Sequence, residues 1–208
     1  MLAHLPLPRP KESHQLTTFD LKTRSKTRRV NRGERVTIGE VEGCGYIAKL
    51  WMTFPGWFWQ HWNPAQPISQ TILKTLILRI SFDGVEQVAA PISDLCGAGL
   101  GEIANFTAKT FGMSSGGFYL AFPMPFHRSF RIEVENLDET IDTDVFMNVL
   151  YQTVDALPDD TPTFHAQFRT GSNPGSEPLL VAEASGAGRF SGCTLTCQGL
   201  EPTYLSYL

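Results

Sequence analysis

One stretch of the chain constrains its fold more than any other: TLILRISFDGVEQVAAPIS, residues 75–93. Two apolar runs flank an Asp-Gly pair, which favours the left-handed backbone that a two-residue hairpin turn requires. We therefore predict two antiparallel strands, 75–84 and 85–93, that meet at Asp83 and Gly84. Similar short apolar runs recur between Gly, Pro, Asn and Asp residues, a pattern typical of an all-β protein.

Ten strands are predicted in this way, with almost no helix. Besides the hairpin they are 35–41, 46–54, 117–124, 129–136, 144–155, 163–170, 177–186 and 189–199. Strands of this length between turn residues favour a β-sandwich or jelly roll.

A proline-rich stretch, PMPF (123–126), leads directly into the predicted strand SFRIEVEN (129–136). Proline cannot donate a backbone hydrogen bond, so this stretch should lie at a sheet edge or crossover. Phe122, Met124 and Phe126 would pack as a wedge under a neighbouring strand. In the strand itself, Phe130, Ile132 and Val134 should face the core while Arg131, Glu133 and Glu135 face outward.

Basic residues are concentrated near the N-terminus, although the formal net charge is −4. Nine of the 17 Lys and Arg residues lie in the first 35 positions. In an extended strand, Lys22, Arg24, Lys26 and Arg28 would form one basic face. That face could contact an anionic polymer, or it could be a solvated edge or an arm on an acidic neighbour. No aromatic residue is interleaved, so nucleic acid is not an expected partner.

Targeting, membrane and cofactor signals are not recognised in the chain. Prolines 6, 8 and 10 interrupt the N-terminal apolar residues, so we expect no signal peptide and favour a cytoplasmic location. No apolar run approaches the ~18 residues of a membrane span. The four cysteines lack zinc-ligand spacing, and we expect no metal and no cofactor.

Two groups of residues are candidates for binding a substrate. One is the aromatic loop PGWFWQHWNP (55–64), which could stack on sugar rings or anchor a subunit interface. The other is the polar face of the predicted strand FHAQFR (164–169), which could line a sugar site or an intersubunit contact. The candidate substrate-binding residues are Trp57, Trp59, His61, Trp62, His165, Gln167 and Arg169.

Acidic and glycine-rich segments give weaker signals. Glu133 and Glu135 would share a strand face with Cα atoms ~6.8 Å apart, which is compatible with a glycosidase pair but is usual for solvated side chains. The acidic stretch 135–144 could hold calcium or form a solvated hairpin tip. The GxGxG string at 97–101 lacks a βαβ context, so it indicates a loop rather than a nucleotide site.

Six segments together resemble glycoside hydrolase family 172 in the order expected of that family: GCGYIAKLWMTF (43–54), LRISFDG (78–84), PISDLCG (91–97), PMPFHRSFRIEVEN (123–136), FHAQFR (164–169) and GAGRFSG (186–192). The resemblance runs from about residue 33 to 199. It implies a jelly-roll β-sandwich, an assembly of trimers or pairs of trimers, and retaining cleavage of fructofuranosides or arabinofuranosides by two glutamates.

The family's chain is nearly twice as long, and its catalytic glutamates follow the point that matches Leu208. Family members also carry Asp-Arg and Gly-Gly-Asn-Asp type segments near the N-terminus. In this chain only Asp20 and Asn31 weakly match these segments. The resemblance therefore assigns no catalytic residue to this chain.

These observations support one main prediction and one alternative. We predict a single jelly-roll domain over 18–208, preceded by an N-terminal arm at 1–17, that resembles the N-terminal half of these enzymes. It should form a trimer or hexamer, and a carbohydrate is a candidate ligand. The alternative is a non-catalytic structural protein that forms a capsid-like shell or ring.

Overall fold

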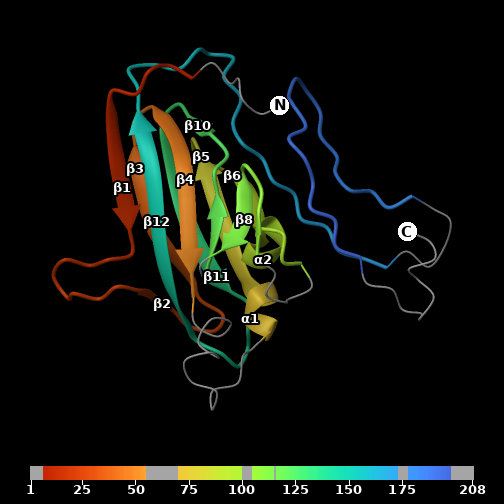
Figure 1. Ribbon diagram of the computed structural model, residues 1–208. Helices are drawn as coiled ribbons and strands as arrows, with labels where there is room; N and C mark the ends of the chain where they lie inside the picture. The colour runs from red at the N-terminus through yellow and green to blue at the C-terminus, as the bar shows by residue number, and fades with distance from the viewer. Residues whose placement is uncertain (1–6, 55–69, 100–104, 115, 173–177, 198–208) are drawn as a thin grey trace.

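The computed structural model describes residues 7–54, 70–99, 105–114, 116–172 and 178–197. Two antiparallel sheets lie face to face (Figure 1). The larger sheet has the order β1 (Glu12–Thr17), β12 (Thr143–Thr153), β4 (Gly45–Thr53), β9 (Gly117–Leu120), β8 (Phe111–Ser114), β7 (Phe106–Thr107). In the same sheet, β2 (Arg28–Val30) pairs with β12 and β10 (Met124–Phe126) pairs with β4.

The smaller sheet has the order β3 (Arg35–Glu42), β11 (Ser129–Asn136), β5 (Leu76–Phe82), β6 (Val85–Pro91). Two short helices, α1 (Gln70–Thr75) and α2 (Ile92–Leu95), flank the β5–β6 hairpin in sequence. The prediction of a single all-β jelly-roll sandwich is thereby confirmed as two packed antiparallel sheets. Residues 12–17, placed in an N-terminal arm by the sequence analysis, form β1 and pair with β12.

The Asp-Gly hairpin forms as predicted. Asp83 has a φ of 56° and Gly84 a φ of 87°, and β5 and β6 pair on either side of them. Two successive positive φ values define the turn whose twist matches that of paired strands. The returning strand ends at Pro91 rather than at 93, because α2 begins at Ile92.

The proline corner also forms as predicted. Met124, Pro125 and Phe126 are buried and make up β10, which pairs with β4 over Gly45–Ile47. Phe122 stands between two other rings, with centroids 6.3 Å from Phe111 and 5.0 Å from Phe164. The wedge thus fills the space beside β4 that lies beyond the end of β9.

The core lies between the sheets and follows the predicted alternation. Phe130, Ile132 and Val134 of β11 are fully buried, and they meet residues such as Val145 and Val149 of β12 in one cluster. Burial of each such side chain contributes roughly 1.5–3 kcal/mol. Both sheets therefore gain their stability from inward-facing alternate residues.

The three C-terminal strand predictions are wrong for the residues that the structure describes. Over 163–172 and 178–197 there is one isolated bridge, between Val88 and Ala166, and no strand. Leu179, Leu180 and Phe190 are exposed. Figure 1 shows these residues in blue, extended beside the sandwich. An alternating pattern makes a segment suitable for a sheet, but it supplies neither the pairing strand nor the layer that buries it.

The extended conformation in which residues 22–28 would form one basic face does not occur. Asp20 accepts hydrogen bonds from the backbone N–H groups of Lys22 (2.7 Å) and Thr23 (2.9 Å), and Arg24 has a φ of 61°. Aspartate commonly closes a turn in this way. The basic side chains consequently do not share one strand face. No helix among the described residues has the length and apolar character to cross a membrane.

Candidate functional site

The acid pair on β11 is engaged by arginines. Arg35 contacts Glu133 at 2.5 Å, and Arg79 contacts Glu135 at 2.6 Å. Both glutamate side chains are largely covered, with exposed fractions of 13% and 21%. They are therefore not the freely solvated acids expected from the sequence.

A third acid connects these two pairs. Glu86 of β6 contacts Arg35 at 3.0 Å and Arg79 at 2.9 Å. The resulting network joins all four strands of the smaller sheet across its outer face. Beyond it, Arg131 contacts both carboxylate oxygens of Glu40, at 2.8 and 2.9 Å, beside a shallow pocket that Ser81 and Ser129 also line.

The electrostatics of this face differ from those of a retaining glycosidase pair. The hydrogen bond from Arg35 lowers the pKa of Glu133 although burial opposes the shift. A general acid for glycoside cleavage needs a raised pKa, so that it holds a proton near neutral pH. Glu133 is instead held as a carboxylate, which suits a role in joining strands.

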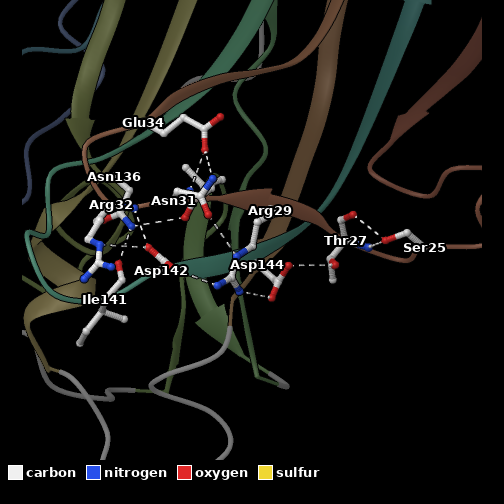
Figure 2. A network of polar contacts seen from close by, with 11 residues as sticks. Ser25, Thr27, Arg29, Asn31, Arg32, Glu34, Asn136, Ile141, Asp142 and Asp144 are labelled. Carbon is white, nitrogen blue, oxygen red and sulfur yellow. Dashed lines mark hydrogen bonds and ion pairs between the residues drawn. The ribbon is translucent and has the colours of Figure 1, made fainter.

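A second polar network lies where β2 and β12 meet (Figure 2). Arg29 contacts Asp144 at 3.0 Å and Asp142 at 3.2 Å. Asp142 also accepts the backbone N–H of Arg32 at 2.9 Å, and this hydrogen bond lowers its pKa despite some burial. Two of the N-terminal basic residues thus meet acids of their own chain, which weighs against a surface kept for anionic polymers.

Asn31, one of the two residues that weakly match the N-terminal segments of family 172, lies within this network. Its backbone N–H and side-chain amide both donate to Glu34, at 2.9 and 2.8 Å. Arg29 Nε in turn lies 3.4 Å from the Asn31 side-chain oxygen (Figure 2). The arrangement fixes the turn between β2 and β3 and needs no bound ligand to satisfy it.

In the acidic stretch 135–144, Asp138 is bonded within the stretch, whereas Glu135, Asp142 and Asp144 contact arginines of other strands. Asp138 accepts hydrogen bonds from the Thr140 N–H at 2.8 Å and the Ile141 N–H at 3.0 Å. Within the described part of the chain, no group of three His, Cys, Asp or Glu residues is placed to hold a metal ion.

The polar candidates of the C-terminal segment are exposed and do not form a strand face. Gln167 exchanges two hydrogen bonds with the backbone of Glu183, at 2.6 and 3.2 Å. His165 lies 3.3 Å from the Thr163 hydroxyl, and Arg169 approaches Glu183 at 4.0 Å. The contacts of Gln167 and Arg169 with Glu183 join two extended stretches of the segment. The other four candidates, Trp57, Trp59, His61 and Trp62, lie outside the described residues.

Sequence reasoning missed an aromatic pair on the outer face of the larger sheet. Trp51 of β4 and Tyr119 of β9 are direct cross-strand partners, and both are half-buried. The alternation of Lys49, Trp51 and Thr53 with buried Leu50 and Met52 was the available signal.

Comparison with known proteins places the chain in a family. A search of curated proteins gives no match. A family model described as GH172 domain-like matches residues 20–149, which is more than half of the 208 residues and includes ten of the strands, β2 to β11, and most of β12. The chain therefore belongs to the GH172 domain-like family, which is related to glycoside hydrolases.

Proposed function

We propose that this protein is a self-assembling jelly-roll module with a carbohydrate-related role, akin to furanoside-cleaving hydrolases but not catalytic by itself. Membership of the GH172 domain-like family supports the carbohydrate connection. The arginine-bound state of Glu133 and Glu135 supports the non-catalytic part, since it removes the one acid pair that the sequence offered on β11.

The observation that carries the assembly proposal is the exposed C-terminal segment. Apolar side chains gather there and lie between 39% and 77% exposed: Phe168, Leu179, Leu180, Val181, Phe190 and Leu195. Among the described residues after 161, the segment makes one backbone–backbone hydrogen bond, from the Ala166 N–H to the Gln87 carbonyl at 3.0 Å. An extended, apolar segment that forms no strand over its described residues is suited to adding strands to another sheet.

We favour a second copy of the chain as the partner whose sheet this C-terminal segment joins. Single jelly rolls in a trimeric or hexameric ring could cover the surfaces that two-domain relatives cover within fewer chains. The segment is also weakly charged, with Arg169, Glu183 and Arg189 as its charged described residues, so it presents little repulsion to a copy of itself.

The alternative function is a purely structural ring- or shell-forming protein with no sugar ligand. The strand-joining ionic network of the smaller sheet favours it, because that network reinforces the sandwich without forming a reaction site. The two functions share the assembly and differ in the response to carbohydrate.

Light scattering of the purified chain tests the assembly. We expect a mass of three or six chains, and we expect Leu180→Asp to shift the distribution toward monomer. Leu137→Asp is the matched control, because Leu137 and Leu180 are both 52% exposed but lie in different parts of the molecule. A monomer at every concentration, or equal effects of the two variants, would contradict the proposal.

Hydrolysis assays test the catalytic part. The chain alone should not turn over aryl arabinofuranosides or fructofuranosides. Turnover that Glu133→Gln or Glu135→Gln abolishes, in a variant that keeps its fold by circular dichroism, would show that β11 carries the chemistry after all.

A further inference from the structure

We propose that the outer face of the larger sheet binds a neutral carbohydrate chain on a platform made of Trp51 and Tyr119. The proposal deepens the carbohydrate part of the proposed function and rests on it for the ligand class. The platform is distinct from the C-terminal segment that carries the assembly proposal.

The two rings belong to a row that crosses the sheet. Asn148 of β12 pairs in register with Trp51 of β4, Trp51 with Tyr119 of β9, and Tyr119 with Gly112 of β8. Neighbours on adjacent strands lie ~5 Å apart. The amide and the two rings therefore span a length comparable to that of two or three sugar units.

Glycines beneath the rings hold them close to the backbone. A Cβ atom added at Gly117 would lie 2.4 Å from three atoms of the Trp51 indole. One added at Gly112 would lie 2.7 Å from the Tyr119 hydroxyl and 2.8 Å from a carbon of its ring. Each ring thus covers a glycine on a neighbouring strand and lies low on the sheet, the orientation in which an aromatic face can stack on a sugar.

The rings are also fixed before any ligand arrives. The Tyr119 hydroxyl donates to the Ala108 carbonyl at 2.7 Å, and Lys49 Nζ lies 5.8 Å from the centre of the Tyr119 ring. Trp51 is restrained by its contact with Gly117. Rings held in one orientation lose little conformational entropy when a ligand binds.

The polar groups around the platform suit hydroxyl groups rather than charges. The Gln15 side-chain amide donates to Oδ1 of the Asn148 side chain at 2.9 Å, which leaves the Asn148 NH₂ group available to other acceptors. The row itself contains no charged side chain. Lys49 of β4 lies beside it and the Arg29–Asp144 ion pair lies farther along the same sheet, whereas the smaller sheet carries Arg and Glu residues across its outer face. The row offers two aromatic rings and the Asn148 amide and carries no charge of its own, so it complements a neutral polyol better than a charged polymer.

Tryptophan-selective NMR tests the platform in the full chain. The chain contains four tryptophans, so labelling with 5-fluorotryptophan gives four signals, and Trp51→Phe assigns one of them. The probes are fructo- and arabino-oligosaccharides, with cello-oligosaccharides as pyranose counterparts. We expect a saturable shift of the Trp51 signal with a Kd on the order of 1 mM, since small ligands gain modest binding energy per atom.

Two glycine variants distinguish a loss of binding caused by displacing Trp51 from a general effect of replacing glycine with alanine. Gly117→Ala should weaken binding about tenfold or more, because the new methyl group displaces the Trp51 indole. Gly171→Ala is the control, since a Cβ atom at Gly171 meets nothing within 4 Å. Trp51→Ala removes the ring without crowding β9 and serves if Gly117→Ala does not fold.

Three results would overturn the proposal. The first is no shift of the Trp51 signal at about 50 mM oligosaccharide, well above the expected Kd. The second is a shift that Gly117→Ala and Trp51→Ala leave unchanged, or one confined to the other tryptophans. The third is a change of assembly mass in Trp51→Ala, which would show that another copy covers this face. Because assembly is measured separately by light scattering, the platform can fail while the assembly proposal stands.

Discussion

Asp83 links the β5–β6 turn to the start of β11, and its removal gives the sharpest test of the fold. The Asp83 carboxylate accepts backbone N–H groups from three consecutive residues: His127 at 3.1 Å, Arg128 at 2.6 Å and Ser129 at 3.1 Å. The residue also adopts a left-handed φ of 56°. One side chain therefore satisfies three donors and occupies a backbone conformation that few residues adopt easily.

The expected cost of Asp83→Ala follows from these two features. Each hydrogen bond contributes roughly 0.5–1.5 kcal/mol net, and the lower half applies here because the site is partly hydrated. Alanine in the left-handed region adds roughly 1 kcal/mol. We therefore expect a loss of about 3 kcal/mol in the free energy of unfolding. Asp83→Asn should lose about 1 kcal/mol, because asparagine keeps one acceptor and tolerates this conformation.

Urea unfolding followed by circular dichroism measures both variants, and the slope m should stay constant if only stability changes. Burial raises the pKa of Asp83, but the three backbone hydrogen bonds outweigh it and hold the pKa below the ordinary value of 3.8. A carboxyl whose pKa is lower in the folded state stabilises the fold above its unfolded pKa, and this contribution is lost as the pH falls through the folded pKa. The stability difference between wild type and Asp83→Asn should hence shrink below about pH 4.

The reasoning fails if Asp83→Ala costs less than about 0.5 kcal/mol, a value typical of surface substitutions. It also fails if Asp83→Asn is as destabilised as Asp83→Ala, because acceptor loss and backbone strain would then not be the cause.

Three further predictions concern the core, the strand pairing and the thiols. Phe130→Ala should lower the free energy of unfolding by about 3–5 kcal/mol in a urea titration, because the ring is fully buried and its centroid lies 4.9 Å from that of Phe126. A loss under about 1 kcal/mol would show that the ring is not in the core. Gly45→Ala should cost more than about 2 kcal/mol, since its Cβ would lie 2.1 Å from the Gln152 carbonyl oxygen between β4 and β12; equal melting temperatures for wild type and variant would refute that close approach. Exposed Cys193 should react with a thiol reagent at once, whereas burial raises the pKa of Cys96 and should delay its reaction until unfolding; rapid reaction of Cys96 in the native protein would contradict its burial.

The site was less predictable from sequence than the fold. The Glu133–Glu135 spacing was visible, but the arginines that hold these acids come from β3 and β5, which are distant in the chain. The Trp51 platform depends on Tyr119, Gly112 and Gly117, which reach it only through cross-strand pairing. A sequence shows which side chains share a strand face, but not which strand lies beside it.

The sequence by itself determined the local elements whose signals lie within a few residues. The Asp-Gly turn, the alternation along β11 and the proline corner at β10 all follow from backbone geometry and side-chain period. Tertiary structure decided the rest. Residues 178–197 contain short apolar runs between glycines, as strands of this protein do, yet they form no strand in the structure. A strand exists only where a partner supplies hydrogen bonds and a second layer buries its face.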